Sequence, residues 1–273
     1  MSLAIYNDSS EWQIVDATDD GRSREWHPMN GPAKHLCRCL EGVHDVQEQI
    51  EHVFTAQNRA KRRRRLRSLV VPLHSLCIAT VDLLNCIASD KTIAERLPRT
   101  AGSDIAQLLA FVRAHVPFGR GEKLTALRNK IAAHYDRDLQ PSDSRQLNAS
   151  IELTEVAEWI SVLISVLCDV LKLNVFMWSG TGYAEGGVMI MCTDPLMTDF
   201  QVEDGQVVAI NGAYITKSPR WCAYAALKTL WLVSDRMFER SSRWRIKEFV
   251  EDAPGDHWSK VVRNFSHRRR GED

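Results

Sequence analysis

Three side chains near the middle of the sequence, Arg128, Asn129 and His134, have types and spacing suited to chemistry on a phosphate ester. An imidazole titrates near neutral pH, so it can donate or accept a proton. A guanidinium presents a fixed fork of donors that fits phosphate oxygens and can stabilise negative charge as it develops. Neither role requires a metal ion. Together these residues indicate proton transfer beside a bound phosphate.

The stretch that carries them, Leu124 to Asp138, has the pattern of a helix. Its buried side is marked by residues three or four apart, namely Leu124, Leu127, Ile131 and His134. On an ideal helix Arg128 and His134 are separated by about 120° around the axis and about 9 Å along it. One straight helix therefore does not bring them together, and a shared site needs a bend, a wide groove or a second copy of the helix.

The string RNKIAAH, residues 128–134, resembles the signature of the HEPN superfamily: arginine, a polar residue, four variable residues and histidine. With Ala133 before the histidine, it is also similar to the RNKxxAH string of the abortive-infection branch. The resemblance implies a bundle of four or five helices with the signature on an internal helix. In catalytic members it further implies metal-independent endonucleolytic cleavage of RNA, in a cleft where two subunits face each other.

RNA carries its own nucleophile, the 2'-hydroxyl, so such an enzyme has only to move protons and stabilise charge on the phosphate. We assign His134 to proton transfer and Arg128 to phosphate binding. Asn129 would orient the phosphate or the histidine, and Lys130 would contact the RNA backbone. Structural alternatives stay open: a histidine at the edge of the core, an Arg128 ion pair with Glu122 or Asp138, and a solvated asparagine. We expect no metal and no cofactor.

A run of six cations among seven residues is the second candidate for nucleic-acid contact. The apolar pattern predicts one helix from Ala33 to about Arg67, with this run at its end. Basic residues are favoured at a helix C-terminus by the dipole, but six exceed what capping needs. We therefore interpret the run as a phosphate-binding patch; its members are Lys61, Arg62, Arg63, Arg64, Arg65 and Arg67.

The surrounding pattern predicts a mainly α fold, an up-and-down helical bundle with a smaller C-terminal α/β extension. A second helix is expected to start near Pro72, a third to run from Ile105 to about His115, and another to start at Thr154. We divide the chain into a loosely attached arm (1–32), the HEPN-like bundle (33–176) and the extension (177–273).

In the extension, glycines at 180, 182, 186 and 187 predict a loop, and Asp204-Gly205 predicts a hairpin turn. The glycine loop lacks the lysine that a P-loop needs, so nucleotide binding is not expected there. A helix should begin at Ser218-Pro219, and the last segment is expected to be partly helical and basic.

Composition narrows the class of protein. Positive and negative side chains balance at 35 each, so affinity for nucleic acid must come from a local patch. Seven cysteines, mostly among apolar residues, are typical of reduced thiols. The beginning of the chain has no secretory pattern, and polar residues interrupt the apolar run Ile160–Phe176. We expect a cytoplasmic protein with no membrane span.

Three hypotheses of function follow from these patterns. The first is a homodimeric HEPN-type ribonuclease, a toxin or antiphage effector, which an antitoxin or other regulatory protein could hold in check. The second is a non-catalytic HEPN-like module that binds RNA or a protein. The third is an interaction scaffold whose C-terminal segment binds the partner. The three predict different outcomes. The first predicts cleavage of RNA, and the second predicts RNA binding without cleavage. The third predicts that neutralising the basic run has no effect on any RNA interaction.

Overall fold

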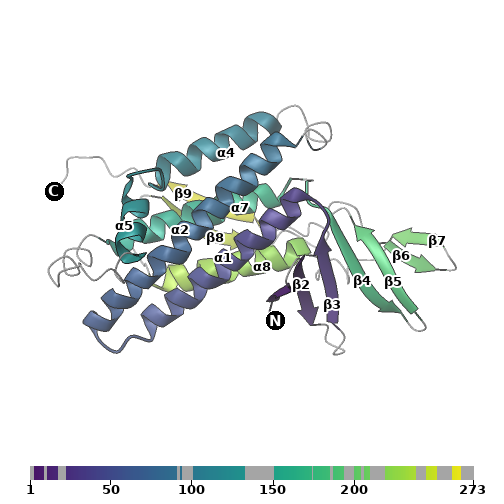
Figure 1. Ribbon diagram of the computed structural model, residues 1–273, viewed down its shortest axis with the longest axis horizontal. Coiled ribbons are helices and arrows are strands. Elements are labelled where there is room, and N and C mark those ends of the chain that lie inside the picture. The colour runs from purple at the N-terminus through teal and green to yellow at the C-terminus, as the bar shows by residue number, and fades with distance from the viewer. Residues whose placement is uncertain are drawn as a thin grey trace.

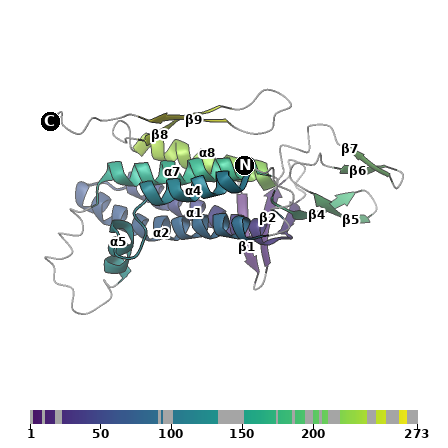
Figure 2. The ribbon, with the colours of Figure 1, turned by 90° about the horizontal axis from the view of Figure 1, so that it is seen from above.

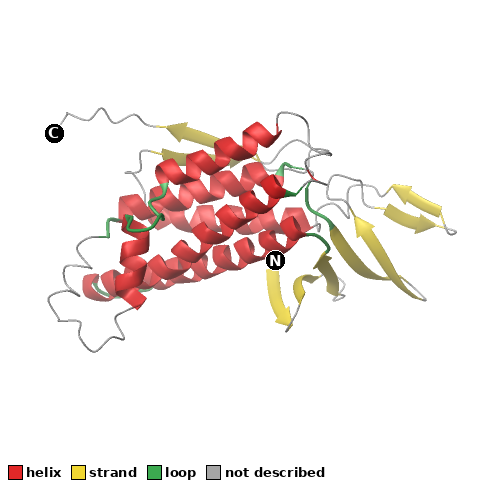
Figure 3. Ribbon diagram, turned by 45° about the horizontal axis from the view of Figure 1, so that its top comes forward, coloured by secondary structure: helices red, strands yellow, loops and turns green. Residues whose placement is uncertain are grey.

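The computed structural model describes residues 3–8, 11–17, 23–90, 93, 101–132, 151–173, 175–184, 187–193, 200–203, 206–209, 219–237, 244–250 and 260–265. This part of the chain is mainly helical, as predicted. Its helices pack side by side as a bundle. The strands before residue 29 and those between residues 178 and 209 lie at one end of it, whereas the strands 244–250 and 260–265 run along the helices (Figures 1 and 3). They are α1 (Gly31–Phe54), α2 (Arg59–Ser89), α4 (Ala101–His115), α5 (Lys123–Ala132), α7 (Leu153–Leu171) and α8 (Pro219–Met237).

The single helix predicted from Ala33 to Arg67 is wrong, because the chain turns between α1 and α2. Helix α1 ends at Phe54, and Asn58 caps α2 by accepting a hydrogen bond from the Lys61 N–H at 2.9 Å. Ala56 stays buried within the turn. The apolar periodicity therefore continues across the break, and only the capping asparagine marks it.

The helix start predicted at Pro72 is also wrong, since Pro72 lies inside α2. Proline in a helix interior removes one hydrogen bond and costs about 3 kcal/mol. Leu69, Val70 and Leu73, on either side of it, are fully buried. Burying three such side chains contributes roughly 1.5–3 kcal/mol each, so packing outweighs the local preference to end the helix.

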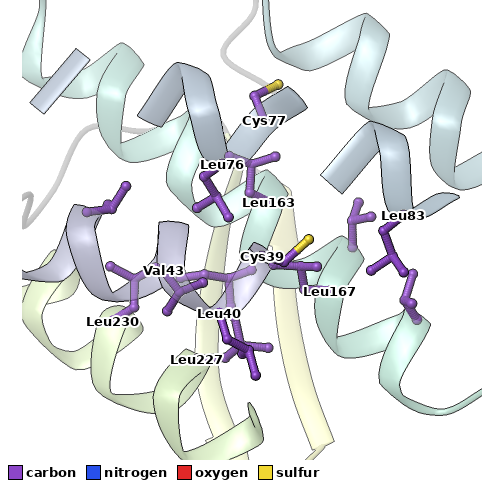
Figure 4. Close-up of a cluster of buried hydrophobic side chains, with 14 of the residues drawn as sticks. Cys39, Leu40, Val43, Leu76, Cys77, Leu83, Leu163, Leu167, Leu227 and Leu230 are labelled. Atoms are coloured by element: carbon purple, nitrogen blue, oxygen red, sulfur yellow. The ribbon is translucent and has the colours of Figure 1, made fainter. Parts of the chain in front are cut away.

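The hydrophobic core lies among α1, α2, α7 and α8. Figure 4 shows their side chains meeting: Cys39, Leu40 and Val43 from α1, Leu76, Cys77 and Leu83 from α2, Leu163 and Leu167 from α7, and Leu227 and Leu230 from α8. The apolar face predicted for α7 is confirmed, and α8 begins at Pro219 as expected. Helix α8 belongs to this core although it follows residue 176. The division into three segments otherwise stays a prediction.

Five antiparallel strands form a sheet in the order β1-β2-β3-β4-β5 (Figures 1 and 2). The strands are β1 (Leu3–Asp8), β2 (Glu11–Ala17), β3 (Ser23–Pro28), β4 (Trp178–Ala184) and β5 (Gly187–Thr193). Strand β3 pairs with β4, so residues expected to form a loose arm join the segment that follows α7. The loop predicted at the first glycines is instead strand β4, because pairing on both sides satisfies its backbone.

Asn30 connects the sheet and the bundle. Its Nδ2 donates to the Val175 carbonyl at 2.8 Å, while its Oδ1 accepts from the N–H groups of Ala33 at 3.1 Å and Met177 at 3.2 Å. One side chain thus caps α1 and holds the chain that leaves α7.

Two further hairpins follow β5. Strands β6 (Phe200–Glu203) and β7 (Gln206–Ala209) are antiparallel and flank Asp204-Gly205, where the turn was expected. The last segment, expected to be partly helical, contains β8 (Trp244–Val250) and β9 (Lys260–Phe265), and β8 contacts α7. Trp244 and Ile246 alternate with Arg245 and Lys247, a pattern typical of strands, whereas basic residues alone do not distinguish a strand from a helix.

Among the described residues, one helical stretch, Ala60–Ser89, is long and apolar enough to cross a membrane by length and composition. Half of its apolar window is buried inside the protein, which is also how a core helix behaves.

The six cysteines whose side chains are described are free thiols, and all except Cys86 are buried. The prediction of reduced, mostly buried thiols is confirmed for these six. Burial raises the pKa of the Cys37 thiol to about 12.

Candidate nucleic-acid interface and active site

A tight turn fixes the start of α5, the helix that carries Arg128. The Glu122 carboxylate accepts a hydrogen bond from the Gly119 N–H at 2.6 Å, and the Leu124 N–H donates to the Pro117 carbonyl at 2.8 Å. Gly121 has a φ of 81°, a conformation that side chains other than glycine rarely adopt. The sequence PFGRGE therefore ends the preceding segment and sets where α5 begins.

One side of α5 faces the bundle, and the other faces solvent. Leu124 and Leu127 are buried in the core, and Lys123 forms an ion pair with Glu155 of α7. These contacts hold α5 against its neighbours. Past them the helix presents three polar side chains, all exposed, which are Arg128, Asn129 and Lys130.

The guanidinium of Arg128 is oriented by its neighbour. Its Nη1 donates to Asn129 Oδ1 at 3.1 Å, so the asparagine acts on the arginine, a role not foreseen from the sequence. Glu122, considered as an ion-pair partner for Arg128, instead binds the Gly119 amide. His134 and Asp138 lie outside the described residues. The structure thus places the arginine and the asparagine of the signature side by side.

The structure adds a histidine that the sequence analysis did not select. His74, half-buried on α2, contacts Thr125 of α5 with its Nε2 3.2 Å from the threonine Oγ1. Thr125 and Arg128 are three residues apart, so they lie on the same side of α5. Burial, and then the charge of Arg128, lower the pKa of His74. The contact spans 51 positions of sequence, so only the packing of α5 on α2 reveals it.

The basic run occupies the first turns of α2 rather than the end of a helix. The helix dipole is positive at this end, so it disfavours cations there. The favourable dipole of a helix C-terminus, which the sequence allowed as an explanation of the run, therefore does not apply to α2. Lys61, Arg62 and Arg64 are exposed, Arg65 and Arg67 are half-buried, and the Arg63 side chain is not among those described.

Arg65 has a structural partner within the fold. Its Nη1 donates to the His52 carbonyl near the end of α1, and also to Thr55 Oγ1 at 2.8 Å. A cation at the C-terminus of α1 is favoured by that helix's dipole. Arg65 therefore stabilises the turn between α1 and α2, and this member of the predicted RNA-binding set is not free to bind a phosphate.

The basic run and α5 are connected along α2. Arg67 and His74 are seven residues apart, which on a helix is about 10.5 Å and within about 20° of the same face. Arg64 lies one turn before Arg67 on the adjoining part of that face. Helix α5 packs against α2, where Thr125, one turn before Arg128, contacts His74. We call Arg64, Arg67, His74 and Arg128 the α2–α5 track.

The chain shows no significant match when it is compared with models of known protein families, with characterised proteins or with solved structures.

Proposed function

We propose that this chain is a metal-independent endoribonuclease of HEPN type that works as a homodimer in the cytoplasm, as a toxin or an antiphage effector. The observation that carries the proposal is the presentation of Arg128. The signature arginine stands on the exposed side of α5, oriented by Asn129 and adjacent to α2, whose first turns hold the basic run. An arginine held in this way is suited to binding a phosphate from solution.

In this proposal the α2–α5 track binds the RNA backbone and places one phosphodiester at Arg128. The guanidinium stabilises the charge that develops on the phosphoryl oxygens. His134 transfers a proton, Asn129 holds the arginine in place, and Lys130 contacts a neighbouring phosphate. The 2'-hydroxyl of the RNA is the nucleophile. A second subunit would supply its own Arg128 and His134 to the same cleft, and a regulatory protein such as an antitoxin would cover it.

The proposal is tested with purified protein, single-stranded RNA and EDTA. Replacing His134→Ala or Arg128→Ala should lower the cleavage rate by about 10²–10⁴-fold, with far-ultraviolet circular dichroism unchanged. Arg113→Ala, at an exposed position of α4, is the matched control and should cleave like the parent. If both signature variants cleave as fast as the parent, the assignment is wrong. Light scattering of the same samples tests the dimer.

The second candidate is a module that binds RNA without cutting it. It is favoured by Lys61, Arg62 and Arg64, which are exposed on α2 and do not depend on His134. The parent would then shift RNA on a gel and leave it intact in EDTA, and charge reversal at these positions would abolish the shift.

A further inference from the structure

One side of α2 carries a regular row of exposed residues. Figures 1 and 2 show α2 on the outer face of the bundle, opposite β8 and β9. Positions spaced alternately by four and three residues fall within an arc of about 80° on a helix, which is the spacing of a coiled-coil contact. We call these residues the α2 seam; all are exposed, and they are Arg64, Ser68, Val71, Ser75, Ile78 and Asp82.

The middle of the α2 seam is apolar, although it faces solvent. Val71 and Ile78 are 36% and 39% exposed, and they are two of the five large apolar residues that the described part of the chain exposes. They lie seven residues apart, so they point the same way. The hydroxyl of Ser75 between them donates to the Val71 carbonyl at 3.2 Å, so it can be buried without losing a partner. This stretch is suited to contact with another helix.

The charges at the two ends of the α2 seam have opposite signs. Arg64 lies towards the N-terminus of the helix and Asp82 towards its C-terminus. Neither forms an ion pair with another residue that the structure describes. A second copy of α2 laid parallel would set arginine against arginine, which is unfavourable, whereas an antiparallel copy sets each arginine against an aspartate. The charge pattern therefore favours an antiparallel second copy.

One register of that pair satisfies every layer of the contact. When the pair is centred on Leu73, Arg64 of each copy meets Asp82 of the other, because these two positions lie equally far from the centre. Ser68 then faces Ile78, and Ser75 faces Val71. Each large side chain thus meets a small serine, an alternation that allows two helices to interdigitate closely. A slip of one turn in either direction would separate the arginine from the aspartate.

We propose that the α2 seam is the interface of a homodimer, in which α2 of one copy packs antiparallel against α2 of a second copy with Leu73 at the centre. The inference rests on the proposed function for the expectation of a second copy, whereas the interface itself follows from described residues of α2. Val71 and Ile78 lose their exposure to water on association. A guanidinium has five donors, so Arg64 paired with Asp82 keeps donors for an RNA phosphate at the rim.

This dimer places both copies of α5 on one side. His74 of α2, one residue from the centre of the pair, contacts Thr125 of α5 with its Nε2 3.2 Å from the threonine Oγ1. The two-fold axis of an antiparallel pair runs across the helices and keeps each flank on its own side. Both α5 helices therefore flank the same edge of the α2 pair, near its middle. Arg128 follows Thr125 by one turn, so the two signature arginines border one edge, as a shared site requires.

Exchange of the two charges tests the interface and its direction. Arg64→Asp and Asp82→Arg are purified separately, one of them with a size tag. In either variant alone, an antiparallel pair sets like charges against each other at both ends, so the dimer dissociation constant should rise by about tenfold. Mixed in equal amounts, the two variants restore opposite charges at both ends and should form a heterodimer with the affinity of the parent. Sedimentation velocity over a range of concentrations measures each constant.

A further variant tests the apolar middle of the α2 seam. Ile78→Asp puts a charge against Ser68 of the second copy and should be monomeric at concentrations at which the parent is dimeric. Leu232→Asp makes the same kind of change at an exposed position of α8, and this matched control should dimerise like the parent. Far-ultraviolet circular dichroism checks that each variant is folded. The charge variants, at exposed positions, decide the matter if Ile78→Asp does not fold.

RNA cleavage measured on the same samples separates this inference from the proposed function. If Arg64→Asp and Asp82→Arg remain as dimeric as the parent, the α2 interface is wrong and the ribonuclease proposal stands. A parent that stays monomeric at its highest soluble concentration, or a mixture of the two variants that does not associate, also overturns the interface. If mixing restores the dimer but no sample cleaves RNA, the interface stands and the proposed function fails.

Discussion

Gly42 of α1 lies directly against Leu76 of α2: a Cβ atom added to the glycine would sit 3.1 Å from the leucine Cβ and 3.2 Å from its Cα. One of these neighbours is backbone, so it cannot rotate away. The absence of a side chain at residue 42 therefore permits the close approach of the two helices. Since α2 carries both the basic run and His74, this approach also sets where the candidate site stands relative to the core.

Gly42→Ala should destabilise the protein by about 1–3 kcal/mol, because the added methyl group must push the two helices apart. In an exposed helix the same change would be stabilising. Urea denaturation followed by circular dichroism measures the difference. Ser68→Ala, at an exposed position of α2, is the control and should stay within about 0.5 kcal/mol of the parent. Equal stability of Gly42→Ala and the parent would contradict the close packing.

Arg65 and Arg62 should behave differently although they are neighbours in the basic run. Arg65→Ala removes the donor that satisfies His52 and Thr55, so it should lower the free energy of unfolding by about 1 kcal/mol. Arg62 is exposed at the first turn, and Arg62→Ala should leave stability unchanged. Thermal melts of the two variants, run side by side, make the comparison. The opposite order would refute the structural role of Arg65.

Exposed cations of the basic run should contribute to RNA affinity through release of counterions. For the double variant Arg62→Ala, Arg64→Ala, the slope of log affinity against log salt should become shallower by about 1–2. Fluorescence anisotropy with labelled single-stranded RNA, at several salt concentrations, gives the slope. Lys172→Ala, at an exposed position after α7, is the control. An unchanged slope in the double variant would exclude phosphate contact at these residues.

Asn129 should act through Arg128. Asn129→Ala removes the acceptor at 3.1 Å, so the guanidinium becomes free to move and kcat/KM for RNA cleavage should fall by about tenfold. Asn129→Asp keeps an acceptor at the same place and should recover most of that loss. Steady-state kinetics on one RNA substrate distinguishes the two. Should aspartate be as damaging as alanine, orientation of Arg128 is not what the asparagine provides.

The pH dependence of stability should carry a contribution from His74. Burial and Arg128 of α5 lower its pKa from 6.5 in the folded state, so the unfolded chain binds the proton more readily. The stability that neutral His74 contributes is fully present above the ordinary pKa of 6.5 and is lost as the pH falls through the lowered pKa. The pKa of half-buried His35 is also lowered, first by burial and then by Arg38, against the opposing charge of Asp82, so His35 acts in the same direction.

We therefore expect the parent to lose stability as the pH is lowered from about 7 to 5, and His74→Gln to lose less. Chemical denaturation at several pH values gives both curves. The exposed variant His44→Gln should follow the parent. Parallel curves for His74→Gln and the parent would mean that the folded protein does not shift the titration of His74.

Local patterns predicted most helices of the bundle but failed where a long-range contact decided the outcome. The periodicity of α7 and the Pro219 start of α8 were sufficient, because each depends on neighbouring residues. Pro72 was misleading, since the burial of its flanking residues depends on the other helices of the bundle, which no local rule contains. Asn58 could have been found, because asparagine is among the preferred N-cap residues, although the basic turn after it is unfavourable at a helix start.

The residues of the candidate site also fall into those that local sequence indicates and those that depend on long-range packing. Arg128 and Asn129 were selected from a short motif, and the described structure places them together on the exposed side of α5. His74 could not have been selected, because it resembles any histidine within an apolar run until α5 is packed beside it. The role of Arg65 likewise depends on a turn that the periodicity concealed.

The packing of α8 against α1 has a consequence for how the protein is made. During synthesis α1 leaves the ribosome long before α8, so one apolar face of the first helix must wait for residues near 219–237. Contacts so distant in sequence form slowly and leave an unfinished chain exposed to aggregation. A ribosome that stalls before α8 would release an incomplete bundle, which chaperones or proteases would have to handle.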